Sequence, residues 1–355
     1  MDNKVSLFSS LTLYVGIDVH KKQWSVSIYS GQIHHRTFSQ PPNPEALKSY
    51  LDKHFPEVKV VCAYEATRFG FWIARSLHNF GYECLVVNPA DIPSTHQQTQ
   101  NKTDPVDSRK IAKTLQAGLL TGCNIPSEGI EGDRQLFRYR KRLWSDLVRV
   151  KNRIKGTLMF SGVQLPAQYD NTYWSKAFLG WLAGVELPSV SCRDTMNLLL
   201  TQYHLTYRHF LDTSIKVRKL LKTARYKNDG KLLRSIPGIG PLTSVQILTE
   251  LGDIKRFSSF KKLNSFVGFK PTTYSSGEHD WKGHLSIRKH KALRSALVEC
   301  AWQTVQNDPA MLVKYEQLLD RMTKKRAVVV IARKLLSRIY FVLKNQQSYQ
   351  LGVIK

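Results

Sequence analysis

Short apolar runs alternate with helical patterns over the first third of the chain. Residues 13–29 predict two strands around a tight turn. Residues 58–64, which are rich in β-branched side chains, and residues 82–87 predict two further strands. Apolar side chains recur at helical spacing over residues 71–80, and again from Pro105 to a stop near Gly118 or Gly122. Strands and helices that alternate in this order predict an α/β domain over residues 10–125.

The middle of the chain combines a helical period with a strongly basic surface. Residues 134–160 contain nine Lys or Arg and a single acid, Asp146. Their apolar positions are spaced four, three, four and four apart: Leu143, Leu147, Val150, Ile154 and Leu158. A similar seam continues in residues 202–226, and residues 161–190 predict an irregular connection or a short helix. We expect a coiled-coil-like helical linker over residues 130–226, either a dimerisation arm or an intramolecular helix pair.

The last third predicts a mainly helical domain over residues 228–345. Within LLRSIPGIGPLTSVQILTELG, a helix, a tight turn and a second helix follow one another. Gly238 and Gly240 in the turn allow backbone N–H groups to approach a phosphate, and the start of the next helix favours negative charge. The segment predicts either a helix-hairpin-helix nucleic-acid element or a simple corner between two helices.

Charge is unevenly distributed along the chain. Its 355 residues hold 53 Lys and Arg against 27 acids, which gives a formal net charge of +26. Residues 1–110 carry a net charge of only +2, so +24 belongs to the remainder. A surplus of this size favours a polyanion as partner, and the common polyanions are DNA, RNA and anionic membrane.

Two features argue against secretion and membrane insertion. The N-terminus lacks the charged and apolar regions of a signal peptide, and no apolar run approaches the roughly 18 residues of a spanning helix. The five cysteines are scattered and never stand in CxxC spacing, which is typical of small core residues in a reducing compartment. We therefore expect a cytoplasmic protein that binds nucleic acid and no membrane.

Four acidic residues stand where a metal site could form. Asp18 follows the strand YVGI, and Glu65 follows the strand VVCAY. Asp104 and Asp107 stand three apart at a predicted helix start, where helix capping alone would also account for them. If the two strands are neighbours, their acids emerge near one edge of the sheet. Carboxylates without His or Cys suit Mg²⁺ or Mn²⁺, and the pattern is that of a ribonuclease-H-like nuclease core.

A Ser-Ser-Gly tripeptide lies in a strongly basic part of the last domain. Ser275, Ser276 and Gly277 are expected on a loop after the turn at Pro271. The nearby cations that could hold a phosphate are Lys282, Arg288, Lys289 and Arg294. A serine among such cations could attack that phosphate, but Ser-Ser-Gly is usually only a turn, and its spacing alone identifies no nucleophile.

Six motifs, taken in order, resemble one known family. They are YVGIDVHK, YEAT, NKTDPVDSRKIA, SIPGIGPLTS, FVGFKP and YSSG…KG, and they look like those of the DEDD-type transposases of insertion-sequence family one-ten. The resemblance covers both end domains and matches the linker in character only. Two positions depart from the family pattern. Ser108 replaces the usual alanine, at what we expect to be a helix surface, and Ser275 adds a second serine before Ser276.

The resemblance implies a fold, a site and partners. The fold is a ribonuclease-H-like (RuvC-like) first domain followed by a C-terminal transposase domain. The motif serine of the latter matches Ser276, with Ser275 as the alternative, and becomes covalently linked to DNA. The partners are a structured noncoding guide RNA (a bridge RNA), donor and target double-stranded DNA, and further copies of the chain in a dimer or tetramer. The implied Mg²⁺ ligands are Asp18, Glu65, Asp104 and Asp107.

We therefore expect an RNA-guided DNA recombinase that moves an insertion sequence, associated with the nucleoid of a prokaryotic cell. Base pairing would select the sequence while the protein grips backbone and shape. The main alternative is a metal-dependent junction endonuclease that uses only the acids and leaves no protein on DNA. A third is a nucleic-acid-binding protein without catalysis, whose function would survive the loss of Asp18.

Overall fold

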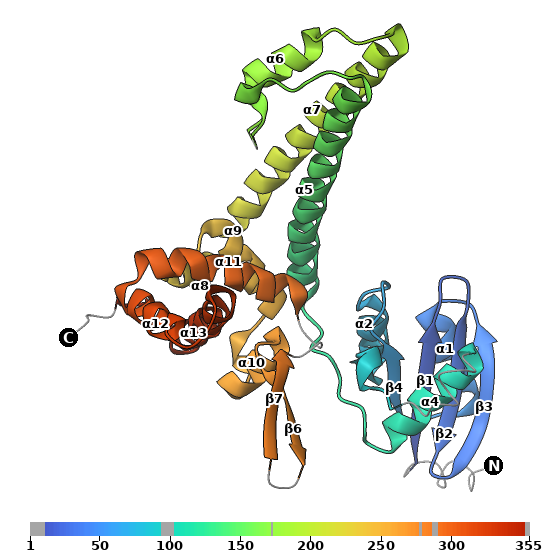
Figure 1. The fold of residues 1–355 in the computed structure, drawn as a ribbon. Coiled ribbons are helices and arrows are strands. Elements are labelled where there is room, and N and C mark those ends of the chain that lie inside the picture. The colour runs from blue at the N-terminus through green and yellow to red at the C-terminus, as the bar shows by residue number, and fades with distance from the viewer. Residues whose placement is uncertain (1–10, 94–102, 172, 277–278, 286–289, 352–355) are drawn as a thin grey trace, which may run out of the picture. The chain divides into compact units, whose positions relative to one another are not determined.

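The computed structural model describes residues 11–93, 103–171, 173–276, 279–285 and 290–351 (Figure 1). For residues 273–276, 279–282 and 284 it describes the backbone alone. The chain divides into two compact units, residues 1–127 and 128–355, and each unit has hydrophobic cores of its own.

The first unit is built on a five-stranded mixed sheet. Its strands are β1 (Thr12–Val19), β2 (Trp24–Ser30), β3 (Ile33–Gln40), β4 (Lys59–Glu65) and β5 (Glu83–Val87). The spatial order is β3-β2-β1-β4-β5, with antiparallel pairing among the first three and parallel pairing from β1 through β4 to β5. The predicted strands and the α/β class of this part of the chain are confirmed.

Helices cover both faces of this sheet. α1 (Pro44–His54) and α2 (Trp72–Asn79) pack on one face, and α4 (Asp104–Gln116) packs on the other. Side chains alternate along β1, so Val15 and Ile17 join the core under α1 and α2, while Gly16 faces α4. The two predicted helices are confirmed as α2 and α4. The sequence pattern reveals neither α1 nor β3.

The second unit contains a long helix pair, called the arm below. It consists of α5 (Glu128–Phe160) and α7 (Val190–Leu220), connected through a short 3₁₀ helix at Ala167–Tyr169 and through α6 (Lys176–Gly184) (Figure 1). All five predicted seam residues of α5 are buried. The predicted amphipathic helix is therefore confirmed, and it packs against α7 of the same chain.

The remainder of the second unit is a helical domain with one β-hairpin. Its helices are α8 (Lys227–Arg234), α9 (Pro241–Leu251), α10 (Phe260–Val267), α11 (Lys291–Asn307), α12 (Pro309–Leu319) and α13 (Lys324–Asn345). The hairpin joins β6 (Pro271–Ser276) to β7 (His279–Leu285). One hydrophobic cluster runs through α8 to α13 and reaches Phe137 of α5 and Val217 of α7. The mainly helical character is confirmed, whereas a division between 130–226 and 228–345 stays a prediction.

Among the described helices, none combines the length and the apolar character that crossing a membrane requires. The five cysteines, all within the described residues, are free thiols.

Candidate active site

Two neighbouring strands bring two of the predicted acids to the same edge of the sheet. β1 and β4 pair in parallel, with Ile17 opposite Tyr64. Asp18 and Glu65 are the next residues along these strands, so they leave the sheet side by side. Because side chains alternate along a strand, both acids stand on the face opposite Ile17 and Tyr64, which is the face that α4 covers.

The start of α4 supplies the other two acids. Thr103, with extended backbone, is the N-cap, and Asp104 is the first helical residue. Asp107 follows three residues later, on the same side of the helix. The N-cap role that the sequence leaves open for Asp104 therefore falls to Thr103. Both acids still lie at the positive end of the helix dipole, which favours their negative charge.

A histidine that the sequence did not single out completes the cluster. His20 Nε2 lies 3.1 Å from Asp18 Oδ2 and 3.6 Å from Asp104 Oδ1. One ligand atom from each of these three residues lies within 4.8 Å of the other two. The Asp18 side chain is 15% exposed, whereas His20 and Asp104 are open to solvent. The only signal in the sequence was the position of His20, two residues after Asp18 in the turn that leaves β1.

The charge of a third carboxylate, that of Asp107, also acts on Asp18. Burial raises the pKa of the Asp18 carboxyl above its usual value, His20 opposes this rise, and Asp104 and Asp107 add to it. Asp107 is thus close enough for its charge to act on the Asp18 carboxyl. A divalent cation beside the Asp18 carboxylate would relieve the repulsion that it feels from these acids.

The donor set fits a divalent metal ion held mainly by oxygen. Asp18 and Asp104 would hold such an ion through carboxylate oxygens, with Glu65 beside Asp18 in the sheet and Asp107 three residues further along α4. His20 adds an imidazole nitrogen, which the sequence-based ligand set did not include.

A buried hydroxyl cluster and a glycine fix α4 on the sheet. Ser108 is fully buried, and its Oγ lies 2.8 Å from Ser27 Oγ and 3.1 Å from Ser25 Oγ, both on β2. The expectation that Ser108 lies at a helix surface is wrong, because its side of α4 faces the sheet. At Gly16 an added Cβ would lie 2.2 Å from the Ser108 carbonyl oxygen, so only glycine permits this approach. The acids of α4 are thus held at a fixed place over β1.

The predicted serines lie in the second unit, on the β6–β7 hairpin. Ser275 and Ser276 are the last two residues of β6, opposite Asp280 and His279 of β7. The expectation of a loop is therefore wrong for both serines, because their segment pairs in register with β7. Gly277 lies outside the described residues. The side chains of both serines also lie outside them, so the choice of nucleophile stays a prediction.

The predicted phosphate-binding cations are described only in part. The backbone of Lys282 belongs to β7, opposite Thr273, whereas Arg288 and Lys289 lie outside the described residues. Arg294, in the first turn of α11, donates from Nη1 to the Gly268 carbonyl at 3.1 Å. Arg294 therefore has a structural contact at the base of the hairpin, and its contact with nucleic acid stays a prediction.

The two glycines of the helix–turn–helix segment have different surroundings. Gly238 has a φ of +87°, and an added Cβ would lie 2.6 Å from Thr304 Oγ1 and 2.7 Å from the Cys300 carbonyl oxygen on α11. Gly240, the N-cap of α9, is exposed, and an added Cβ there would have nothing within 4 Å. Gly238 therefore allows the turn to pack on α11, while Gly240 presents open backbone at a helix start, where a phosphate could bind.

Known families match both ends of the chain. Residues 15–161 match the DEDD transposase family of IS110, whose description is "Transposase". Residues 230–316 match a second family, described as "Transposase IS116/IS110/IS902 family". Together with the acidic cluster, these matches define an enzyme that cuts and rejoins DNA, of a domain type that suggests a divalent metal.

Similar curated proteins identify the family of transposases more narrowly. The transposase for insertion sequence element IS1533 of Leptospira borgpetersenii is 24% identical over 307 residues, 82% of this chain and 85% of the relative. The transposase for IS1111A of Coxiella burnetii is 24% identical over 292 residues, 78% of this chain and 76% of the relative. The pilin gene-inverting protein of Moraxella bovis is 31% identical over 139 residues, 36% and 40% of the two chains. The chain belongs to the IS110 family of insertion-sequence transposases.

Proposed function

We propose that this transposase is an RNA-guided DNA recombinase that moves its insertion sequence through a covalent protein–DNA intermediate. The supporting observation is the acidic cluster at the start of α4: Asp18 and Asp104 lie close together with His20, Glu65 follows the neighbouring strand, and Asp107 lies in the first turn of α4. A mixed sheet with an antiparallel and a parallel half agrees with a ribonuclease-H-like (RuvC-like) fold. One relative carries a name that refers to gene inversion, which is a DNA rearrangement.

The acids would hold Mg²⁺, with Mn²⁺ as the alternative. A bound ion of this kind would stabilise the negative charge that develops on the reacting phosphate. The chain's own contribution is to fix the ligands. β1 holds Asp18, the docked helix α4 holds Asp104 and Asp107, and His20 limits the rotation of the Asp18 carboxylate through their hydrogen bond.

Ser276 would supply the nucleophile. Its Oγ gives up a proton and bonds to phosphorus, while the bond from phosphorus to a deoxyribose oxygen breaks. That oxygen takes up a proton, so one phosphodiester becomes a phosphoserine ester and a free hydroxyl. The reverse reaction with a hydroxyl of another strand releases the serine and joins the new strands, because the ester conserves the bond energy.

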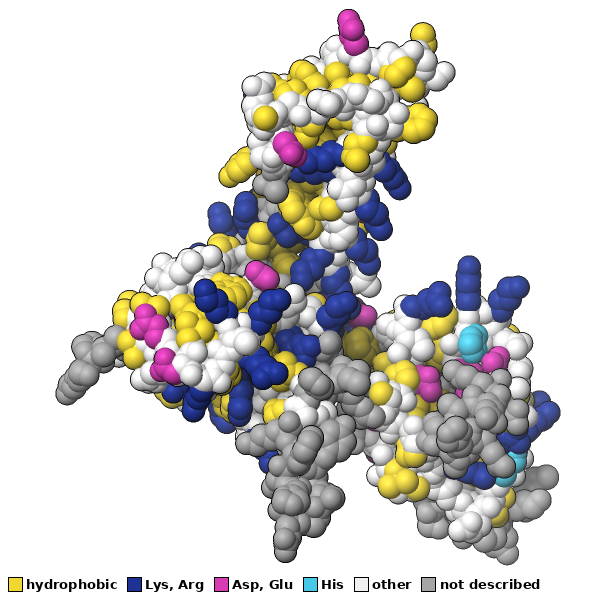
Figure 2. Space-filling model, viewed as in Figure 1, with side chains coloured by type: hydrophobic (Ala, Val, Ile, Leu, Met, Phe, Trp, Pro, Cys, Tyr) yellow, Lys and Arg dark blue, Asp and Glu magenta, His cyan; other side chains and the backbone are white. Residues whose placement is uncertain are grey.

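A structured noncoding RNA and two DNA duplexes would be the polyanionic partners that the large positive net charge of the chain favours. On the face of the second unit seen in Figure 2, Lys and Arg side chains follow the arm and gather at its base, with few acids among them. Exposed cations of α5 include Lys141, Arg142, Arg149 and Arg153. Such a surface binds backbone phosphates without reading bases, which leaves sequence choice to base pairing.

We also propose a homo-oligomer, a dimer or a tetramer, formed through the arm. Large apolar side chains of the arm remain exposed after α5 and α7 have paired: Trp144, Leu198, Leu205, Leu211 and Ile215. Exposed apolar rows of this kind mark protein–protein contacts. Light scattering at several concentrations measures the assembly, and a monomer at all of them would remove this part of the proposal.

A denaturing gel tests the reaction. Labelled donor DNA is incubated with the protein, Mg²⁺ and RNA transcribed from the noncoding region beside the gene. Wild-type protein and Ser275→Ala should form a denaturant-resistant adduct with DNA, and Ser276→Ala should bind RNA and DNA without forming one. An adduct in Ser276→Ala but not in Ser275→Ala would move the nucleophile by one residue.

The second candidate is a junction endonuclease that uses only the acids. The open acidic cluster favours it, because metal-bound carboxylates suffice to hydrolyse a phosphodiester. Wild-type protein that cuts the DNA but leaves no adduct would establish this reading in place of the serine reaction.

A further inference from the structure

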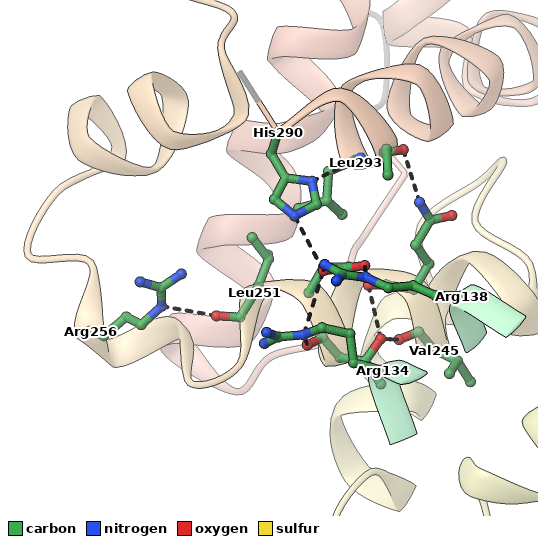
Figure 3. Close-up of polar contacts among 11 residues, drawn as sticks. Arg134, Arg138, Val245, Leu251, Arg256, His290 and Leu293 are labelled. Atoms are coloured by element: carbon green, nitrogen blue, oxygen red, sulfur yellow. Dashed lines mark hydrogen bonds and ion pairs between the residues drawn. The ribbon is translucent and has the colours of Figure 1, made fainter. Parts of the chain in front are cut away.

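A buried carboxylate lies in the second unit, on α9. Glu250 is 2% exposed and accepts two hydrogen bonds from Arg138, Nε to Oε1 at 2.8 Å and Nη2 to Oε2 at 2.7 Å. His290 Nε2 lies 3.2 Å from Oε2, and Arg134 Nε lies 3.5 Å from it. Figure 3 shows Arg134, Arg138 and His290 turned toward the same point. Burial opposes ionisation, but the hydrogen bonds from His290 and Arg138 outweigh it and lower the pKa of Glu250 to about 2.

The proposed chemistry uses none of these groups. A buried ion pair adds little net stability over apolar side chains of the same size, since desolvation offsets much of the attraction. Its directional hydrogen bonds, in contrast, fix the elements that carry the partners.

Glu250 connects the arm to the hairpin that carries the serines. Arg134 and Arg138 lie near the start of α5, and Arg134 Nε also donates to the Thr249 carbonyl at 2.8 Å. His290 is the N-cap of α11 and stands five residues after Leu285, where β7 ends. His290 also contacts Phe266 near the end of α10 (Phe260–Val267), and the chain continues from there to β6, the strand that carries Ser276.

His290 is fixed from both sides of its ring. Its Nδ1 accepts a hydrogen bond from the Leu293 backbone N–H at 3.3 Å, so the ring proton sits on Nε2 and is donated to Glu250. The His290 backbone N–H donates to the Phe266 carbonyl at 3.3 Å, and the two rings lie 5.4 Å apart. The residue can therefore not rotate without losing a contact to α9, α10 or α11.

The same region holds the incoming side of the hairpin. Arg294, one turn after His290, donates to the Gly268 carbonyl, and Phe269 is buried in the core just before β6 begins at Pro271. The segment that leads into β6 is thus anchored at the start of α11 through the His290–Phe266 and Arg294–Gly268 contacts. Of these two residues, His290 is the one that also bonds to Glu250.

We propose that Glu250 and His290 are a positioning pair that sets the direction of the β6–β7 hairpin, and with it Ser276, relative to the arm. This proposal rests on the proposed function, since it concerns the serine of that reaction. Arg134 and Arg138 fix Glu250 to α5, and His290 transmits this position through Phe266 to the end of α10, from which the chain continues to β6.

Two substitutions of His290 in the full-length protein separate positioning from folding. In His290→Asn the side-chain oxygen still caps the Leu293 N–H, but the side chain is too short to reach Glu250. In His290→Gln the amide reaches the place of Nε2 and donates to Glu250. The readouts are the rate constant of adduct formation in the gel assay described above, RNA binding, and Tm. The matched control is Asp133→Asn, which breaks the 2.7 Å ion pair of α5 with Arg225 and leaves the Glu250 cluster intact.

We expect His290→Asn to keep RNA binding and to form the adduct about 100-fold more slowly, the usual effect of misplacing a reacting group by about 1 Å. His290→Gln should restore most of the rate, and Asp133→Asn should retain it even with a lower Tm. A wild-type rate in His290→Asn would overturn the proposal, as would equal losses of rate and Tm in the Asn and Gln variants. If wild-type protein cuts DNA without any adduct, the serine reaction itself is wrong, and the positioning role is lost with it.

Discussion

A single methyl group on β1 should displace the helix that carries two of the acids. In Gly16→Ala, the added Cβ would lie 2.2 Å from the Ser108 carbonyl oxygen and 2.4 Å from the Ala112 nitrogen. Both atoms are backbone atoms of α4, so no side-chain rotation can relieve the contact. The helix must move away from the sheet as a whole.

The size of the displacement follows from these distances. Ordinary contact begins at 3.4 Å, so α4 has to shift outward by about 1 Å. Overpacking of this kind costs about 1–3 kcal/mol in unfolding free energy. The shift also moves Asp104 and Asp107 away from Asp18, and misplacement by about 1 Å can lower a reaction rate roughly 100-fold.

Hydrogen exchange followed by mass spectrometry measures the first effect, and the rate of adduct formation or DNA cutting measures the second. Amides of β1 and α4 should exchange faster in Gly16→Ala, while those of the second unit stay unchanged. The control is Gly132→Ala on α5, where an added Cβ meets nothing within 4 Å and should stabilise the helix by about 0.5–1 kcal/mol. Wild-type exchange and wild-type activity in Gly16→Ala would refute the reasoning.

Three further predictions concern the acids, the charge and the buried carboxylate. Asp18→Ala or Glu65→Ala should abolish transposition and leave RNA binding intact, because most of the positive charge lies outside the first unit. Transposition at the wild-type rate in Asp18→Ala would remove the metal hypothesis. RNA affinity should fall about 1000-fold between 50 and 200 mM salt if six or more phosphates are contacted, and a log–log slope near zero would contradict this. The lowered pKa of Glu250 means that its ionised form stabilises the fold above pH ~4.5, and that this stability, on the order of 3 kcal/mol, is lost as the pH falls from about 4.5 to 2. Glu250→Gln should lack this pH-dependent part of the stability. Urea unfolding of both proteins at a series of acidic pH values measures it, and identical dependence of stability on pH would contradict the role of Glu250.

The sequence predicted the parts of the fold that bury an apolar pattern. β1, β2, β4 and β5 are rich in β-branched residues because their core faces are fully buried, and the seam of α5 is legible because α7 covers it. β3, with the sequence IHHRTFSQ, is the edge strand next to β2 among the described strands and is largely exposed, so its composition carries no apolar alternation.

The candidate site was predictable as far as its residues end strands or begin a helix. Asp18 and Glu65 could be placed together because parallel neighbours bring consecutive strand ends to one edge. His20 could not, since a histidine in a turn has no period that marks its contacts. The burial of Ser108 was hidden for a similar reason. A small polar residue near a helix start looks exposed until its two hydroxyl partners on β2 are known.

The helix α5 belongs by homology to one part of the protein and by packing to the other. The family match to the N-terminal part extends to residue 161 and so includes all of α5, whereas the compact first unit ends at residue 127. A gene copy truncated after residue 161 would therefore encode a helix whose seam from Leu143 to Leu158 has lost α7. Such a product should aggregate, although it retains all four candidate metal ligands. A fragment that ends at residue 127 exposes no such seam. The segment that the family match covers is thus longer than the compact first unit, and a fragment designed to carry the four acids alone should end near residue 127.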